Sequence, residues 1–262
     1  MKQKEHLRDL LVQRGLVKTP DEAERMILAA QVSVDGFMIT QAGAPVSTDA
    51  YIKIQDGRKY VSRGGYKLEG ALEDFSFNPT GLSCIDVGAS SGGFSDCLLQ
   101  RGASQVTAVD VGYGQFDWRL RKDSRITLFE RTNIAKVDPA SLGAPFDLLV
   151  ADLSFTSLAR LAPQLARLIG VEGNCLTLVK PQFELPKDFV KDGVIRSFDF
   201  HVEAIDKVAK SYESNGLAVQ GLSFSHLLGP KGNREFWIWA AKCGATATID
   251  ITEVVRKAHW EL

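Results

Sequence analysis

Residues 83–112, SCIDVGASSGGFSDCLLQRGASQVTAVDVG, contain two apolar runs that each end at an acid, Asp86 and Asp110. A glycine-dense turn follows the first run, and an amphipathic stretch over 93–102 leads to the second. Short apolar runs that are separated by a turn and a helical pattern are typical of strand–helix–strand units. The segment therefore predicts two neighbouring strands of an α/β sheet, joined by a glycine turn and a helix.

The same alternation continues beyond this segment. Helical patterns lie between most of the candidate strands, notably at 93–102, 156–169 and 200–214, and the strands themselves are expected at 82–87, 105–110, 126–130, 146–151, 174–180, 218–225 and 235–242. Strands that alternate with helices favour a parallel, doubly wound sheet. We predict an α/β fold with a Rossmann-like, seven-stranded sheet over 66–262.

The first 60 residues show a different pattern, in which two short helices precede a small sheet. Thr19 is placed to cap the second helix, with Glu22 at the position that a capping box requires. The dipeptide Asp35-Gly36 is a strong hairpin signal, and 51–54 resembles one more short strand. About 55 residues bury too small a core for an enzyme. We therefore predict a small α+β binding module over 1–60.

A basic linker to about residue 65 joins the two predicted domains. The segment 53–67 carries five positive charges against the single acid Asp56: Lys53, Arg58, Lys59, Arg63 and Lys67. Two interpretations remain open, a solvated flexible linker or a patch that contacts nucleic acid. Arg63-Gly64-Gly65 is expected to form a flexible corner, after which helical periodicity resumes.

Composition sets limits on the class of protein. The 262 residues carry a net charge of −1, so nucleic-acid binding must depend on local patches. No apolar stretch approaches a membrane span, and the N-terminus lacks the apolar core of a signal peptide. The four cysteines lie far apart without a CxxC pair, which disfavours a metal site. We expect a cytoplasmic protein with reduced thiols, no metal and no membrane partner; the sequence specifies no oligomeric state.

The glycine turn is expected to hold a nucleoside. In doubly wound sheets, ligands bind beyond the carboxyl ends of the strands. Asp86 is placed there to reach an ammonium or to orient the loop, and Asp110 to accept hydrogen bonds from ribose hydroxyls. A nucleoside with a cationic amino-acid tail and no phosphate fits both acids, which indicates S-adenosylmethionine. Nicotinamide dinucleotide is the alternative, but Gly88, Gly92 and Gly93 do not follow the G-x-G-x-x-G spacing.

The chemistry is expected to involve four charged residues, namely Lys67, Asp152, Lys180 and Glu235. A ribose 2′-hydroxyl is a poor nucleophile, so its proton must leave as a methyl group arrives. A lysine near another cation, or one that is buried, loses its proton more readily and becomes a usable base. Asp152 and Glu235 would hold the two lysines in place by hydrogen bonds.

Other methyl-transfer chemistries fit the sequence less well. Amine methylation of bases typically uses an Asn/Asp-Pro-Pro-aromatic turn, and "DLSF" at 152–155 has no proline. Methylation of cytosine at C5 requires a cysteine nucleophile in a loop, whereas Cys84 and Cys175 lie within apolar strands. A ribose oxygen is therefore the preferred acceptor.

Seven motifs together give a specific resemblance: "YVSRGGYKL", "DVGASSGGF", "AVDVGYGQ", "ERTNIA", "VADLSF", "LVKPQFE" and "GNREFW". With them the whole chain resembles the hemolysin A / TlyA family of ribosomal RNA methyltransferases. The resemblance implies an S4-like RNA-binding unit followed by an FtsJ-like 2′-O-methyltransferase domain. It also implies a cytidine ribose in ribosomal RNA, within ribosomal subunits, as the substrate, and the same four catalytic residues.

The resemblance completes the set of candidate site residues. It implies that Asn133 and Ile134 flank the adenine side of the cofactor. The full set of cofactor candidates is Asp86, Gly88, Ser90, Ser91, Gly92, Gly93, Phe94, Asp110, Val111, Asn133, Ile134 and Asp152. The candidates for RNA contact are Arg8, Arg14, Lys18, Arg58, Lys59 and Arg63. Two positions depart from the family pattern, because Arg8 follows His6-Leu7 where the family opens with Arg-Leu-Asp, and Ala135 replaces an arginine.

Two other functions compete with this interpretation. An RNA-binding assembly factor without catalytic activity would need only the N-terminal unit and the basic linker, but such a factor has no physical reason to keep the four charged residues and the glycine turn together. A pore-forming hemolysin is disfavoured, because the sequence has no membrane span and no long basic amphipathic helix.

Overall fold

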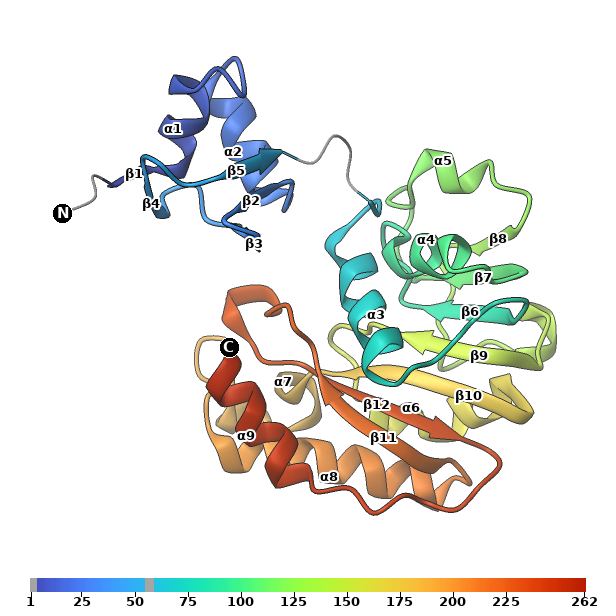
Figure 1. Cartoon of the computed structure of the whole chain (residues 1–262). Coiled ribbons are helices and arrows are strands. Elements are labelled where there is room, and N and C mark those ends of the chain that lie inside the picture. The colour runs from blue at the N-terminus through green and yellow to red at the C-terminus, as the bar shows by residue number, and fades with distance from the viewer. Residues whose placement is uncertain (1–3, 55–58) are drawn as a thin grey trace. The chain divides into compact units, whose positions relative to one another are not determined.

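The computed structural model describes residues 4–54 and 59–262, and the chain divides into two compact units, Met1–Arg63 and Gly64–Leu262 (Figure 1). The first unit contains two helices, α1 (Leu7–Gln13) and α2 (Pro20–Leu28). Their apolar faces share one small core with the strands. The Thr19 hydroxyl accepts a hydrogen bond from the Glu22 amide, as predicted. The Glu22 carboxylate, however, accepts from the Lys18 amide, one residue before the expected partner.

Two small sheets complete the first unit. The predicted hairpin forms between β2 (Val32–Val34) and β3 (Phe37–Met38), with Asp35 and Gly36 both at positive φ, and β5 (Ile52–Ile54) pairs with the other edge of β2. A second sheet, which the sequence did not predict, pairs β1 (Lys4–His6) with β4 (Pro45–Ser47). These two strands have only three residues each, so their pairing depends on contacts that periodicity does not show.

The second unit is built on a seven-stranded sheet in the order β11-β12-β10-β9-β6-β7-β8. Its strands are β6 (Ser83–Val87), β7 (Gln105–Val109), β8 (Ile126–Phe129), β9 (Phe146–Ala151), β10 (Ile169–Val179), β11 (Ala218–Phe224) and β12 (Phe236–Ala241). The strand order reverses beside β6, and the glycine turn of 88–93 follows this strand. This reversal is the position where doubly wound folds bind ligands.

Helices cover both faces of the sheet (Figure 1). They are α3 (Arg63–Asp74), α4 (Gly93–Gln100), α5 (Trp118–Arg121), α6 (Leu158–Leu168), α7 (Pro181–Glu184), α8 (Phe198–Ser214) and α9 (Ile251–Glu261), with short 3-10 turns at Pro139–Leu142, Lys187–Phe189 and Pro230–Gly232. Strand β12 shows how the faces differ. Phe236 and Ile238 join the core under α6, α8 and α9. Trp237 and Trp239 point to the opposite face, where Trp237 packs against Phe94 of α4.

Two expectations about this unit require correction. Strand β12 runs antiparallel to β10 and β11, because the connection 225–235 is too short for a crossover helix and the chain turns back. Arg63-Gly64-Gly65 is not a flexible corner but the first turn of α3. The C-terminal segment forms α9, and its buried Val255 and Ala258 close the core.

Candidate active site

A cavity of about 390 Å³ opens at the carboxyl ends of β6, β7 and β9. The sequence candidates that line it are Gly88, Ser90, Asp110, Val111, Asn133, Ile134 and Asp152. Small-molecule sites in proteins have volumes of roughly 300–1,000 Å³. The cavity therefore has the size and the position that a doubly wound fold gives to its ligand.

Gly88 allows the backbone to approach this cavity closely. Its φ is +84°, and a Cβ at this position would lie 2.8 Å from the Asp152 carbonyl oxygen. Any other residue would meet both a strained backbone conformation and a backbone atom that cannot move aside. The tight contact places the turn after β6 directly against the end of β9.

Asp86 holds the glycine turn in place through hydrogen bonds from Ser95. One carboxylate oxygen, Oδ2, accepts hydrogen bonds from the Ser95 amide at 2.9 Å and the Ser95 hydroxyl at 2.7 Å, which fixes the first turn of α4. The other oxygen, Oδ1, is buried and has no hydrogen-bond partner among the residues that the structure describes. Burial raises the pKa of Asp86 to about 7, and the hydrogen bonds from Ser95 offset part of this shift. Asp86 thus orients the loop from a buried position.

Asp110 organises the second wall of the cavity. Its carboxylate accepts hydrogen bonds from the Ser90 amide at 2.8 Å and the Gly112 amide at 2.6 Å, so it ties the turn after β6 to the loop after β7. The same side chain lines the cavity. A carboxylate at the end of the second strand is the group that binds ribose hydroxyls in dinucleotide folds.

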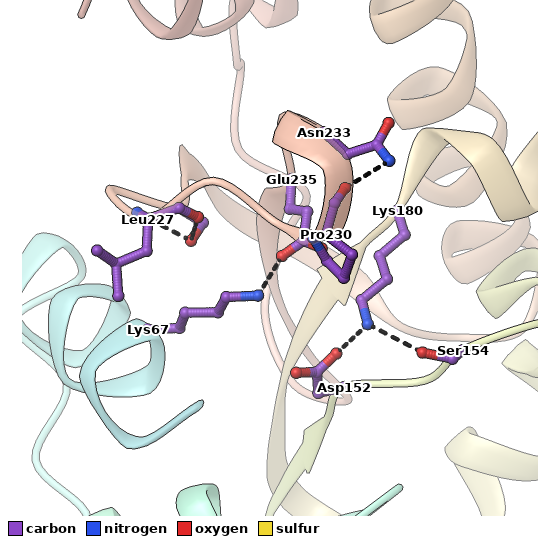
Figure 2. Close-up of polar contacts among 9 residues, drawn as sticks. Lys67, Asp152, Ser154, Lys180, Leu227, Pro230, Asn233 and Glu235 are labelled. Carbon is purple, nitrogen blue, oxygen red and sulfur yellow. Dashed lines mark hydrogen bonds and ion pairs between the residues drawn. The ribbon is translucent and has the colours of Figure 1, made fainter. Parts of the chain in front are cut away.

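The four predicted catalytic residues form two ion pairs (Figure 2). Lys67 Nζ lies 2.6 Å from Glu235 Oε2, and Lys180 Nζ lies 2.5 Å from Asp152 Oδ1. Lys180 also donates a hydrogen bond to the Ser154 hydroxyl at 3.3 Å. Asp152 and Ser154 both line the cavity. The Lys180 ammonium therefore lies beside the cavity, between two of its lining residues.

The Lys67–Glu235 pair is the more deeply buried of the two. Glu235 is fully buried, and this burial raises its pKa, although Lys67 and Lys180 partly offset the shift. The positive charges of both lysines thus lower the pKa of the same carboxylate. Removing either member would leave a buried charge without its partner, which typically costs about 3–5 kcal/mol.

The loop before β12 holds Glu235 through residues that the sequence analysis did not select. Asn233 is buried, and its side-chain amide donates to the carbonyl oxygens of Gly193 and Pro230, at 2.9 and 3.0 Å (Figure 2 shows the Pro230 contact). A Cβ at Gly229 would lie only 2.1 Å from Glu235 Oε1. The motif "GNREFW" contains the relevant asparagine, but only the folded loop reveals its role.

Five of the cofactor candidates do not line the cavity, namely Asp86, Ser91, Gly92, Gly93 and Phe94. Phe94 packs in the core, with its ring 5.5 Å from that of Trp237. Gly92 faces Leu120 and Phe116, which leave no room for a Cβ. These residues shape the turn through packing, and sequence alone cannot separate this role from ligand contact.

Several lining residues were not selected from the sequence. Gln115, Thr132, Ser154 and Phe155 all contribute to the cavity wall, together with Ala135, one of the two positions that depart from the family pattern. The side chain of Phe155 is 91% exposed, and its backbone has a φ of +60°. The sequence feature that could have identified these residues is their position, since each follows the end of a strand by a few residues.

The RNA-contact candidates lie in the first unit. The Arg8 side chain is partly exposed and pairs with Asp9, and Lys18, Lys59 and Arg63 are exposed. Arg14 has a structural contact, because it donates to the Ala50 carbonyl oxygen at 2.7 Å. Arg58 lies outside the described residues.

The cysteines in the sheet are not nucleophiles. Cys84 and Cys175 are buried in β6 and β10, and burial raises the pKa of each thiol to about 12, with Asp147 adding to the shift at Cys84. Within residues 4–54 and 59–262, no group of three or more His, Cys, Asp or Glu side chains is arranged to hold a metal ion. Over the same ranges, no helix has the length and apolar character needed to cross a bilayer.

Comparison with known proteins agrees with this geometry. Residues 60–242 match the model of the FtsJ-like methyltransferase family. The chain is 42% identical to the 16S/23S rRNA (cytidine-2'-O)-methyltransferase TlyA of Mycobacterium tuberculosis, over 87% of each chain. It is 33% identical to hemolysin A of Brachyspira hyodysenteriae, over 85% of this chain and 93% of the relative. The solved structure of a candidate hemolysin from Streptococcus thermophilus superposes with a TM-score of 0.77 at 34% identity, covering 100% of this chain and 98% of the other. The chain therefore belongs to the FtsJ-like methyltransferase family, in the group that contains TlyA and hemolysin A.

Proposed function

We propose that this protein transfers a methyl group from S-adenosylmethionine to the 2′-hydroxyl of a cytidine in ribosomal RNA. The observation that carries the proposal is the position of Lys180. Its side-chain nitrogen, which accepts a proton when it is a neutral amine, contacts Asp152 and Ser154, two residues that line the cavity beyond the sheet. A proton-accepting group beside a nucleoside cavity is what transfer to a hydroxyl requires.

The residues around the cavity fit S-adenosylmethionine, which supplies a methyl group already activated by its sulfonium. Asp110 is placed to accept hydrogen bonds from the ribose hydroxyls of this cofactor. Asn133 and Ile134 line the cavity where the adenine would lie. Asp86 lies behind the cavity wall and supports the cofactor site indirectly, by fixing the turn through its hydrogen bonds from Ser95.

The two ion pairs have separate roles in this proposal. Lys180 Nζ, as the neutral amine, accepts the proton of the 2′-hydroxyl as the methyl group leaves the sulfonium, and Asp152 and Ser154 hold the ammonium that forms by direct contact. The buried Lys67–Glu235 pair fixes α3 against the loop before β12. Lys67 is also the second positive charge near Glu235, besides Lys180, and both lysines lower the pKa of this carboxylate. Positioning of the reacting oxygen contributes the remaining acceleration.

The cytidine and the ribosomal context come from the relatives, since TlyA of Mycobacterium tuberculosis is named as a 16S/23S rRNA (cytidine-2'-O)-methyltransferase. We assign residues 1–60, which lie within the first unit, to S4-like RNA binding, with their basic residues on the RNA backbone. The substrate would then be an assembled ribosomal subunit in the cytoplasm.

Two measurements separate this enzyme from an assembly factor that only binds RNA. Calorimetry tests for binding of S-adenosylmethionine, and methyl incorporation into each unmodified ribosomal subunit tests for turnover. We expect both to be positive, with incorporation lost in Lys180→Ala. Absence of cofactor binding, or RNA binding without any incorporation, would contradict the proposed function.

A further inference from the structure

A second cavity, of about 620 Å³, lies beside the cofactor cavity. The two share four lining residues, namely Ala135, Phe155, Thr156 and Leu161. The second cavity extends from this shared wall to α7 and to Lys207 of α8. Its volume is sufficient for a nucleotide-sized group. None of the roles proposed above uses it.

The charged groups that line this second cavity favour an anion. Arg160 is exposed on the first turn of α6, and Lys207 donates a hydrogen bond to the Glu184 carbonyl oxygen. Of the described residues in the lining, Glu184 is the one acid, and it is buried. Its carboxylate accepts hydrogen bonds from the Ser157 hydroxyl and the Leu158 amide, both at 2.6 Å. The acid is thus bonded to protein donors, and the lining as a whole carries two cations against one acid, a net charge of +1.

Aromatic rings form part of the lining. Phe183 of α7 lies beside Phe155, with ring centroids 5.1 Å apart and an angle of 45° between the rings. Phe155 belongs to both cavities, whereas Phe183 belongs only to the second. Exposed aromatic faces bind nucleic-acid bases by stacking, and nearby cations bind the phosphates that connect them.

We propose that this second cavity is a subsite for the nucleotide next to the methylated cytidine. The neighbouring base packs against Phe183, and Arg160 contacts the phosphate that joins this nucleotide to the strand. Phe155 then stands between the two nucleotides, as the wall that the cavities share. This subsite rests on the proposed function, since it requires an RNA strand that crosses the cofactor cavity.

Arg160→Ala tests the phosphate contact in the full-length protein. With ribosomal subunits as substrate, we expect KM to rise about tenfold with little change in kcat. The slope of log affinity against log salt should become smaller by about one, as for the loss of a single phosphate contact. The affinity for S-adenosylmethionine should remain that of the unchanged protein. Arg160→Lys should restore most of the affinity, because a phosphate contact depends mainly on charge.

Arg167→Ala is the matched control. Arg167 lies on the same helix, is exposed, and donates to Gln164 at 3.0 Å without lining either cavity. We expect its KM and salt slope to be unchanged. Phe183→Leu tests the stacking surface with a conservative apolar replacement, and we expect about a tenfold loss of RNA affinity. Cofactor affinity reports on whether this variant retains its fold.

The outcomes distinguish the subsite from the proposed function. If the unchanged protein methylates the RNA but Arg160→Ala keeps the same KM and salt slope, the subsite is wrong and the proposed function stands. An equal effect of Arg160→Ala and Arg167→Ala would also reject the subsite. If the unchanged protein does not methylate ribosomal RNA at all, the proposed function itself fails.

Discussion

Lys180 is the residue on which the proposed chemistry depends. We expect Lys180→Ala to lower kcat by about 10²–10⁴-fold, the usual contribution of a general base. S-adenosylmethionine should still bind, because the ammonium contacts Asp152 and Ser154 at the edge of the cavity. Lys210→Ala is a suitable control, since this exposed lysine pairs with Asp206 on α8 and lines neither cavity. Full activity of Lys180→Ala in a single-turnover assay would remove this residue from the proposed role.

Asp86 makes the stability of the protein depend on pH. Its pKa is about 7 in the folded protein, against 3.8 as the ordinary value, because the carboxyl group is buried. Between these two values the folded state binds more protons than the unfolded state, so the free energy of unfolding decreases as pH rises from about 4 to about 7. Urea denaturation across this range should show the decrease, and Asp86→Asn should reduce it. An identical pH dependence in the variant would contradict the assignment.

At the scale of elements, the loop before β12 controls the position of Glu235. Gly229 has a φ of −70°, which alanine can adopt, but a Cβ there would lie 2.1 Å from Glu235 Oε1. We expect Gly229→Ala to displace the carboxylate, to weaken its pairing with Lys67 and to lower kcat by at least tenfold. Gly170→Ala is the control, because the added Cβ would make only ordinary contacts there, 3.7 Å from the nearest atom. Equal activity of the two variants would show that the loop tolerates the change.

The elements also show which parts of the structure the sequence can predict. All seven strands of the large sheet were located from the sequence, most of them as short apolar runs. Strand β10 nevertheless begins at Ile169, five residues before its predicted start at 174, and β11 (AVQGLSF) is not continuously apolar. The sequence did not predict the direction of β12, which depends on the length of a loop, or the pairing of β1 with β4, which depends on distant contacts. Likewise, Asp152 and Lys180 were predictable as residues at strand ends, whereas Asn233 and Phe94 acquire their roles only through packing against distant segments.

For the whole molecule, RNA binding is assigned to the first unit and to the basic segment that follows it. We expect Arg63→Glu to weaken binding to ribosomal subunits and to reduce its salt dependence, because one fewer phosphate contact releases fewer counterions. Lys210→Glu is the control, because it reverses a charge on α8, outside this basic segment. Filter binding at several salt concentrations measures both quantities, and an unchanged slope for Arg63→Glu would reject the assignment.

The central claim is methylation of a ribose oxygen, and the chemistry of the product tests it most directly. The full chain is incubated with S-adenosylmethionine carrying a labelled methyl group and with each unmodified ribosomal subunit separately, and the RNA is then hydrolysed in alkali. A 2′-O-methyl group blocks cleavage of the adjacent phosphodiester, so we expect the label in a dinucleotide that resists alkali. Label recovered in mononucleotides would mean methylation of a base and would contradict the role proposed for Lys180 and Asp152.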